Sequence, residues 1–263
     1  MKDTLQRLNL SGELAKNQLS LLNSRLTLKL VEERLPLTTE ALFASLDDMS
    51  PQDILLTLPS SKDQITSRSG APFKGHTDFL RSAYSDPDIT MNFLAPRLTV
   101  ALLTDHIALR EVEQNITRES IERKISLTIR EIKPIRNIDQ VFFSGVNPHC
   151  GENGIISGFD KVIGEGIDLL RPQFPHIKFY GPFAGDTVLF NQCSPNNLFV
   201  FASHDQGLAP FKLMNGLTGI NLTLGLPFKR VSVDHGTAFD LYGLNKANYQ
   251  GMLYLMDEAI KWT

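Results

Sequence analysis

The sequence predicts an α/β protein built on a mainly parallel sheet. Short apolar runs that are typical of buried strands alternate with amphipathic segments of helical spacing, and this alternation favours parallel strands. The chain has 263 residues, which is long enough for a substantial core in one large domain or two small ones. In addition, several histidines directly follow the apolar runs, where α/β sheets place their ligands.

Apolar spacing and end signals place the elements along the chain. Helices are expected at 12–33, 39–46, 77–84, about 118–131 with Thr117 as the N-cap, 158–170 and 248–262. Strands are expected at 53–58 and 177–180, in the apolar runs that start at Thr99, Gln140 and Leu198, and at 219–224. The segment from Ser60 to Gly75 is polar and rich in turn residues.

Three of the six histidines lie just past a predicted strand: His106, His149 and His204. Ligands of open α/β sheets bind outside the carboxyl ends of the strands. Three imidazoles brought there by separate strands are a plausible ligand set for a divalent metal with an open coordination position. This pattern indicates metal-assisted chemistry on a small molecule. His176 has no comparable neighbours and is expected in an exposed loop.

Composition excludes several classes of function. The 26 basic and 29 acidic residues are nearly balanced and form no basic tract, so nucleic acid is not an expected partner. Two cysteines do not make a disulfide framework and suit a reducing compartment. No apolar stretch approaches the roughly 20 residues of a membrane span, and the first residues are too polar for a secretory signal. We therefore expect a cytoplasmic protein with no membrane association.

Two glycine-containing segments are candidate binding loops. His76 and Thr77 stand together at a predicted helix start, where backbone N–H groups favour anions; a simple helix cap is the alternative. The segment 147–154 (NPHCGENG) follows a strand, and its glycines allow close backbone approach, although a tight βα turn would use the same residues. We interpret Cys150 as a small buried side chain rather than a ligand.

Two later segments carry polar and basic residues. The segment 203–212 contains a histidine, a carboxylate, an amide and Lys212, and a buried lysine can bind an anion or act as a base. If 219–224 is extended, Asn221 and Thr223 share one face. Arg230 follows, with the planar fork that suits a phosphate or carboxylate. The sequence contains no dinucleotide-binding G-x-G-x-x-G after a strand, no P-loop and no nucleophile elbow. Residue chemistry alone therefore predicts a metal-dependent enzyme that acts on an anionic small molecule.

Five segments in this order resemble the 4-hydroxythreonine-4-phosphate dehydrogenase family of pyridoxal phosphate biosynthesis: GHTDFL, NPHCGENG, HDQGLAPFK, GINLTLGLPFKR and SVDHGTAFD. The similarity runs from about Asp53 to the C-terminus. It implies a three-layer α/β/α fold with mainly parallel sheets and two subdomains around an active-site cleft, approximately 1–95 plus 225–263 and 96–224. The whole of 1–263 is then a single dehydrogenase-family region.

The resemblance also implies site residues, cofactors and assembly. His106, His149 and His204 are expected to bind a divalent metal (Zn, Mg or Co), with Lys212 and His204 as catalytic residues. The phosphorylated hydroxy-acid substrate is expected to be held by His76, Thr77, Lys212, Asn221 and Arg230. The cofactor would be NAD or NADP, with no binding residues assigned. Family members are homodimers whose metal ligands are divided between the subunits.

The implied reaction is oxidation of 4-phosphooxy-L-threonine to a 3-oxo acid, which decarboxylates to 3-amino-2-oxopropyl phosphate. The chain departs from the family at its start, where the first 49 residues supply no Gly-Asp-Pro-Ala-Gly-type loop, and it is therefore expected to be N-terminally shortened. Ser203 also stands where the family usually has tyrosine. The alternatives are a related dehydrogenase of phospho-threonate, phospho-erythronate or a diol, a non-catalytic remnant, and a metal-dependent lyase or hydrolase.

Overall fold

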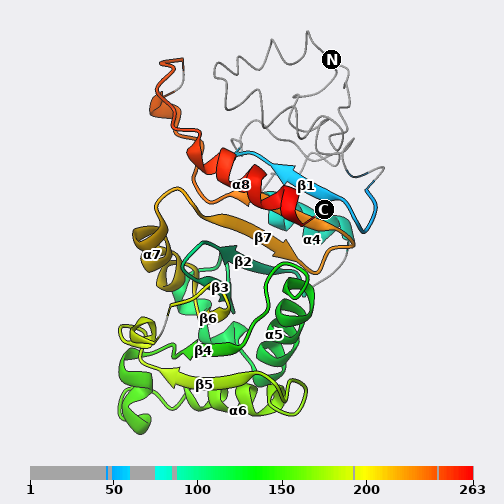
Figure 1. Ribbon diagram of the computed structural model, residues 1–263. Coiled ribbons are helices and arrows are strands. Elements are labelled where there is room, and N and C mark those ends of the chain that lie inside the picture. The colour runs from blue at the N-terminus through cyan, green and yellow to red at the C-terminus, as the bar shows by residue number, and fades with distance from the viewer. Residues whose placement is uncertain are drawn as a thin grey trace.

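One mixed sheet of eight strands organises the chain, in the order β1-β8-β7-β2-β3-β6-β4-β5 (Figure 1). The computed structural model describes residues 46, 49–59, 75–84, 88–191, 193–241 and 243–262. The helices expected at 12–33 and 39–46 lie outside these residues, apart from Leu46. The strands are β1 (Ile54–Thr57), β2 (Thr90–Leu94), β3 (Thr99–Leu102), β4 (Gln140–Ser144), β5 (Lys178–Phe183), β6 (Asn197–Phe201), β7 (Ile220–Leu224) and β8 (Lys229–Val233).

The sheet combines parallel and antiparallel pairing. Parallel pairs join β3 to β6, β6 to β4, β4 to β5 and β1 to β8, whereas β8, β7, β2 and β3 pair antiparallel in turn. Two of the three antiparallel pairs, β2–β3 and β7–β8, are joined by four-residue connections, 95–98 and 225–228, which are too short for a crossover helix. Gly225 begins the second of them at φ +91°, in the left-handed region that glycine tolerates. The predicted α/β class is confirmed, with most strand pairs parallel.

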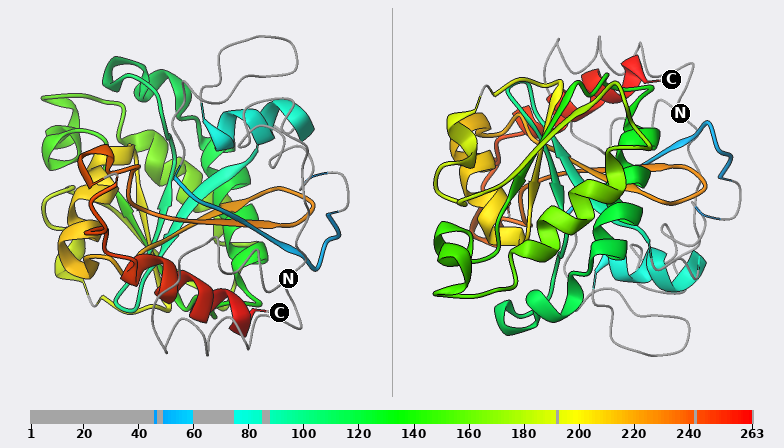
Figure 2. Two further views of the ribbon diagram at one scale, coloured as in Figure 1. Left: turned by 90° about the horizontal axis from the view of Figure 1, so that it is seen from above. Right: turned by 90° about the horizontal axis from the view of Figure 1, so that it is seen from below.

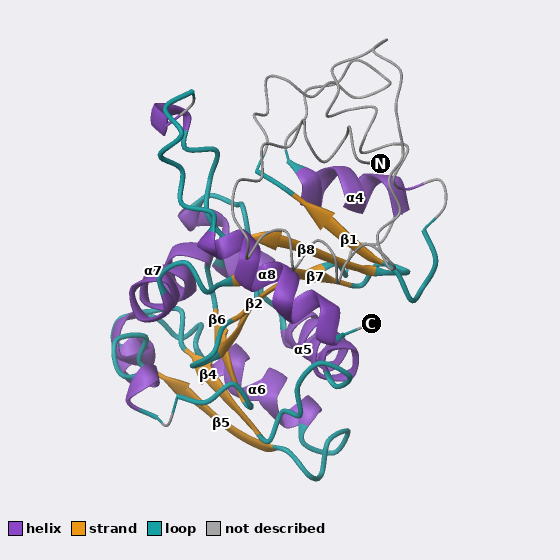
Figure 3. Cartoon of the chain, turned by 45° about the horizontal axis from the view of Figure 1, so that its top comes forward, coloured by secondary structure: helices purple, strands orange, loops and turns teal. Residues whose placement is uncertain are grey.

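Five helices of the described chain cover both faces of this sheet (Figures 2 and 3). They are α4 (His76–Tyr84), α5 (Arg118–Ile132), α6 (Lys161–Leu170), α7 (His204–Asn215) and α8 (Gln250–Lys261). Residues of α5, α6 and α8 belong to the larger apolar cluster on one face, and α7 packs against a second cluster on the other face. The α4 helix packs against Leu55 of β1 and Phe228. Leu55, Arg230, Thr223 and Met91 are successive cross-strand partners and share one face, and Met91 belongs to the cluster that α7 packs against. These three layers place α4 and α7 on the same side of the sheet.

Local signals explain why α5 begins at its first residue. Thr117 Oγ1 accepts a hydrogen bond from the Ser120 backbone N–H at 3.1 Å, and Ser120 Oγ accepts one from the Thr117 N–H at 2.9 Å. This reciprocal capping box satisfies two donors that a helix start leaves open, and it confirms Thr117 as the predicted cap.

The remaining predictions were mostly confirmed, with three omissions. The strands predicted at 53–58, 177–180 and 219–224, the helices at 77–84, 158–170 and 248–262, and the three apolar runs all form elements near the expected positions. The pattern missed β2 and β8, which are short and interrupted by polar side chains, and it missed α7, which contains Pro210. None of the helices in the described residues combines the length and apolar character that a membrane crossing requires.

Candidate active site

The three histidines singled out by sequence follow three adjacent parallel strands. Because β3, β6 and β4 pair parallel, their carboxyl ends meet at one edge of the sheet. His106 lies in the loop after β3, His149 in the 3-10 turn η4 (Pro148–Gly154) after β4, and His204 is the first residue of α7 after β6. The fold therefore delivers all three to the same edge.

Within one chain, two of these imidazoles lie side by side. The ring centroids of His106 and His204 are 5.4 Å apart, with 36° between the ring planes. His204 Nδ1 lies 2.8 Å from Asp205 Oδ1, so a proton on Nδ1 would leave the Nε2 lone pair available for a ligand. No group of three or more His, Cys, Asp or Glu side chains is placed to hold a metal ion in the described ranges. His149 therefore does not complete a metal site with this pair inside a single chain.

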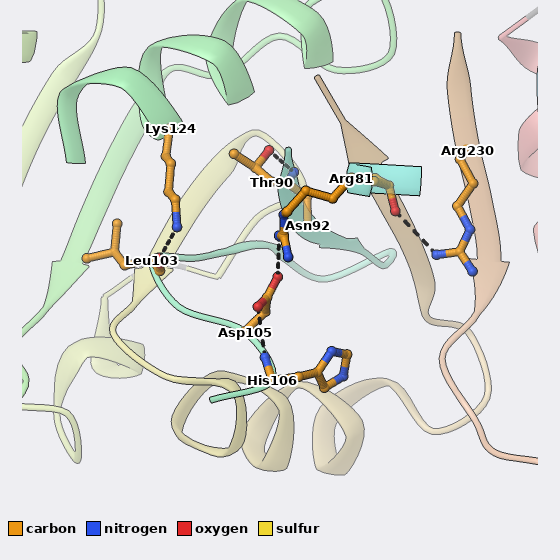
Figure 4. A network of polar contacts seen from close by, with 9 residues as sticks. Arg81, Thr90, Asn92, Leu103, Asp105, His106, Lys124 and Arg230 are labelled. Carbon is orange, nitrogen blue, oxygen red and sulfur yellow. Dashed lines mark hydrogen bonds and ion pairs between the residues drawn. The ribbon is translucent and has the colours of Figure 1, made fainter. Parts of the chain in front are cut away.

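Asp105 connects His106 to helix α4 (Figure 4). Its Oδ1 accepts a hydrogen bond from the His106 backbone N–H at 2.9 Å, and its Oδ2 lies 3.1 Å from Arg81 Nη2. Burial alone raises the pKa of Asp105, but Arg81, followed by His106 and Lys124, lowers it below the ordinary value. The carboxylate is thus held in its charged form between α4 and the loop that carries His106.

Lys124 of α5 supports the end of β3 from the other side. Its Nζ donates to the Leu103 carbonyl oxygen at 2.5 Å. Burial lowers the pKa of this ammonium, against the opposing effect of Asp105. Residues from two helices therefore fix the strand end that leads to His106.

His149 is presented by a loop with unusual backbone. Five consecutive residues, 149–153, have φ between 46° and 75°, and four of them are not glycine. Left-handed conformation costs an L-residue roughly 1–2 kcal/mol, so this loop requires support from its surroundings. His149 itself is exposed, and Cys150 is only half-buried, so the predicted buried character of Cys150 is wrong in degree. Burial nevertheless raises the pKa of the Cys150 thiol, which disfavours a thiolate ligand.

Arg230 of β8 is a buried cation whose hydrogen-bond partners among the described residues are neutral hydroxyl groups. Its side chain donates to Thr57 Oγ1 from Nε at 3.0 Å and from Nη2 at 2.6 Å, and to Thr223 Oγ1 from Nη1 at 3.2 Å. The residue is 4% exposed, and burial lowers its pKa to about 10. No carboxylate within the described ranges pairs with this guanidinium, which therefore favours an anionic ligand.

Helix α4 brings His76 and Thr77 to the same side of the sheet. Burial lowers the pKa of His76 to about 4, and the positive charge of Arg230 adds to this effect. Thr77 is buried at 6% exposure. A neutral imidazole near a buried guanidinium is suited to donate a hydrogen bond to an anion without adding a second charge.

Asn221 and Thr223 lie on one face of β7, as expected for an extended segment. Thr223 is the cross-strand partner of Arg230, and Asn221 is the partner of Ser232, two residues along. Asn221 Oδ1 is buried and has no hydrogen-bond partner in the part of the chain that the structure describes. An unsatisfied amide oxygen beside the Arg230 face is a ready acceptor for a ligand hydroxyl or ammonium group.

Lys212 is exposed on α7. The possibility that it is a buried lysine, which the sequence left open, is therefore not met. Its Nζ donates to the Asp234 carbonyl oxygen at 2.6 Å. Burial raises the pKa of the Asp234 carboxyl group, although Lys212 and His235 act in the opposite direction. Asp234 packs over Gly219, where an added Cβ would lie 2.4 Å from Asp234 Oδ2. Lys212 retains two further N–H donors for an anionic group. His176 is exposed in the loop before β5, as predicted.

A hollow of about 350 Å³ opens among the loops that carry the histidines. Its lining comes from the loops after β3, β4 and β6: Leu109, Arg110, Val112, Glu113, Val146, Asn147, Ala202 and Ser203. Sequence reasoning missed Asp105, Arg81, Glu113 and Asp160, because single carboxylates and arginines outside a motif look like solvated surface residues. Thr57 was missed as well, because a single threonine inside a predicted strand looks like an ordinary strand residue.

An α/β fold with a histidine pair at its strand ends, and a buried arginine that forms no ion pair among the described residues, is typical of an enzyme that acts on a small anionic molecule. The model of the family "Pyridoxal phosphate biosynthetic protein PdxA" matches residues 37–261. The chain therefore belongs to this family, and the resemblance stated from the five segments is confirmed. The match begins at residue 37, upstream of Asp53, from which the resemblance of the five segments was expected to run.

Individual relatives agree with this assignment. The 4-hydroxythreonine-4-phosphate dehydrogenase of Sulfurihydrogenibium sp. (strain YO3AOP1) is 38% identical over 211 residues, covering 79% of this chain and 64% of the relative. The enzyme of the same name from Aquifex aeolicus (strain VF5) is 34% identical over 212 residues, covering 77% and 62%. This chain thus spans less than two thirds of the length of these relatives.

Solved structures show the same fold. A 4-hydroxythreonine-4-phosphate dehydrogenase from Klebsiella pneumoniae has a TM-score of 0.65 at 29% identity, covering 80% of this chain and 64% of that chain. A terephthalate 1,2-cis-dihydrodiol dehydrogenase from Burkholderia xenovorans LB400 has a TM-score of 0.58 at 23% identity, covering 85% and 71%. The second likeness concerns the fold alone.

Proposed function

We propose that this chain is a dehydrogenase that oxidises 4-phosphooxy-L-threonine with NAD or NADP and a divalent metal, giving a 3-oxo acid that decarboxylates to 3-amino-2-oxopropyl phosphate. The names of its relatives support the reaction class. The single observation that carries the substrate class is Arg230, a buried guanidinium with hydroxyl partners and no carboxylate among the described ion pairs.

The phosphate group would bind where these polar groups meet. Arg230 would supply the charged donors, His76 a neutral donor, and Thr77 a hydroxyl group on the same helix. A phosphate neutralises the buried charge, which offsets the desolvation that lowers the pKa of Arg230. Asn221 and Lys212 would hold the remaining polar groups of the substrate and orient the carbon that reacts.

The histidine pair supports the proposed metal site. His106 and His204 fit two positions of a divalent ion, because imidazole nitrogen is a common ligand for Zn and Co. When bound, such an ion supplies positive charge that lowers the pKa of a substrate hydroxyl group. The Asp205 carboxylate on His204 Nδ1 would fix the orientation of the ring.

The third ligand is proposed to be His149 of the second subunit in a homodimer. Exposed apolar side chains lie on loops that follow three of the parallel strands: Leu109 at 76%, Ile155 at 84% and Phe190 at 86% exposure. Such side chains near polar site residues favour a protein–protein interface, so a second copy would cover them and complete the metal site.

The test uses purified full-length chain, a divalent metal and either nicotinamide cofactor. Candidate substrates are 4-phosphooxy-L-threonine, phospho-threonate, phospho-erythronate and unphosphorylated 4-hydroxythreonine. Turnover is followed by NADH or NADPH absorbance and, in reactions without a nicotinamide, by chromatographic loss of the substrate. We expect turnover of 4-phosphooxy-L-threonine only. Equal turnover of the unphosphorylated compound would contradict the phosphate role of Arg230, and turnover without a nicotinamide would indicate a lyase or hydrolase.

A further inference from the structure

The loop that carries His149 adopts a conformation that its own residues disfavour. His149, Cys150, Glu152 and Asn153 all have positive φ, between 46° and 55°. L-residues rarely take this conformation, and four in one short segment persist only where the surrounding structure imposes it. The contacts that impose it are therefore of functional interest.

A buried carboxylate holds the start of this loop. Asp160 is 3% exposed, and its Oδ1 accepts a hydrogen bond from the Val146 backbone N–H at 2.6 Å. The Asn147 backbone N–H points at the same carboxylate, 3.3 Å from Oδ2. Asp160 occupies the N-terminal cap position of α6 but makes no side-chain bond to that helix. An aspartate at this position normally caps its own helix, but the side chain of Asp160 accepts hydrogen bonds from the loop instead.

The side-chain amide of Asn147 joins two carboxylates. Its Nδ2 donates to Asp160 Oδ2 at 2.9 Å and to Glu113 Oε1 at 2.8 Å. Glu113 follows β3, and it also accepts a bond from Ser157 Oγ at 3.4 Å. Both amide protons of Asn147 are thereby used. The Glu113–Asn147–Asp160 bridge connects the loop after β3 with the loop after β4.

Two glycines allow the bridge to close. A Cβ at Gly145 would lie 2.6 Å from Asp160 Oδ1, and a Cβ at Gly151 would lie 2.0 Å from the Ser157 carbonyl oxygen. Any side chain at either position would displace the carboxylate or the loop. The absence of side chains at both positions thus belongs to the same arrangement as the three bridge residues.

We propose that the Glu113–Asn147–Asp160 bridge is a positioning device for His149, which it holds in the orientation required for metal binding. The proposal rests on the proposed function, in which His149 is a metal ligand. His149 is an exposed residue of a backbone turn that is unfavourable in isolation, so its placement depends on these contacts. Groups that orient a metal ligand typically change metal affinity by about 10–100-fold when they are removed.

The experiment compares Asp160→Asn and Glu113→Ala with the wild-type protein, as full-length chain. The first variant keeps the shape of the side chain but replaces an acceptor oxygen with an N–H donor, and the second removes a half-buried acceptor, so at least one variant should fold. Hydrogen exchange of residues 145–154 is measured in metal-free protein, and Co²⁺ affinity is measured by titration. We expect faster exchange confined to this segment and Co²⁺ affinity reduced by about 10–100-fold, with unchanged circular dichroism.

Asn137→Ala provides the matched control. Asn137 Nδ2 donates to Asp139 Oδ1 at 2.8 Å, which is also a hydrogen bond from an amide to a carboxylate. It lies just before the first residue of β4, whereas His149 follows the last residue of that strand. This variant should keep wild-type exchange at 145–154 and wild-type Co²⁺ affinity. Unchanged exchange in both bridge variants would overturn the proposal.

A His149→Ala variant separates failure of this proposal from failure of the proposed function. If His149→Ala lowers Co²⁺ affinity and the bridge variants do not, the positioning role is wrong and the metal assignment stands. If His149→Ala binds Co²⁺ like the wild-type protein, the metal assignment fails, and the positioning proposal fails with it.

Discussion

Replacement of Arg230 by methionine should separate ligand affinity from stability. The fall in the pKa of Arg230 from 12.5 to about 10 corresponds to about 3 kcal/mol of destabilisation of the charged side chain in the fold. Methionine removes this cost. It also removes three hydrogen bonds to Thr57 and Thr223, which contribute about 1 kcal/mol each. The two effects nearly cancel, so the free energy of unfolding should change by no more than about 1–2 kcal/mol.

Binding of a phosphorylated ligand should respond very differently. Two charge-assisted hydrogen bonds from the guanidinium to phosphate contribute about 1.5–3 kcal/mol each. At about 1.4 kcal/mol per tenfold, their loss corresponds to roughly 100-fold to 10,000-fold weaker binding. Calorimetric titration with 4-phosphooxy-L-threonine gives the affinity, and urea unfolding of the ligand-free protein gives the stability.

Arg136 offers a matched control for this substitution. It is also an arginine whose pKa is lowered by burial, and its Nη1 donates to Thr99 Oγ1 at 2.8 Å, but it lies before β4, away from the Arg230 face. Arg136→Met should leave ligand affinity unchanged. An Arg230→Met protein that binds the phosphorylated ligand as tightly as the wild type would refute the anion-site reasoning.

Three further predictions follow from the site and its surroundings. Because the folded-state pKa of His76 is lowered from 6.5 to about 4, the unfolded state binds the proton more tightly. The stabilising contribution of neutral His76 is therefore complete above pH 6.5 and is lost as the pH falls toward 4. His76→Gln should flatten this part of a plot of unfolding free energy against pH. An unchanged slope would contradict the burial of His76. Gly219→Ala should destabilise the fold by about 1–3 kcal/mol, since the new Cβ would lie 2.4 Å from a carboxylate oxygen. Gly164→Ala in α6, with no neighbouring atom within 4 Å of the added Cβ, should stabilise the fold by about 0.4–1 kcal/mol. Thermal unfolding of both variants measures the difference, and a Gly164→Ala protein less stable than Gly219→Ala would contradict this prediction. His204→Ala should abolish Co²⁺ binding while the exposed His176→Ala does not, and equal binding by both would remove His204 from the metal site.

The placement of the candidate site residues follows most directly from the sequence where a motif and a strand end coincide. His106 and His204 lie together because the parallel pairing of β3 and β6 brings the ends of two apolar runs to one edge. Asn221 and Thr223 share a face because strand side chains alternate. The sequence did not predict the environment of Lys212, because the polar segment that contains it forms a helix and leaves its side chain exposed.

The supporting residues could not be found from local pattern. Asp160 is separated from Val146 by 14 residues, and Arg81 is separated from Asp105 by 24, yet each pair is in direct contact. Nothing in the neighbourhood of a lone carboxylate indicates which distant backbone it will contact. The antiparallel part of the sheet was missed for a similar reason, because β2 and β8 are recognisable chiefly by their partners.

By itself, the sequence determined the α/β class, the family, most helices and strands, and the residue types that converge at the strand ends. These features follow from periodicity, capping and motif order, which act over a few neighbouring residues. Only the tertiary structure decided that Arg230 is a buried cation among hydroxyl groups and that two imidazoles of one chain are adjacent. It also decided that Glu113, Asn147 and Asp160 join the loop of the third imidazole to the loop after β3. Burial and charge pairing depend on what the rest of the fold places around a group, and no local stretch of sequence contains that information.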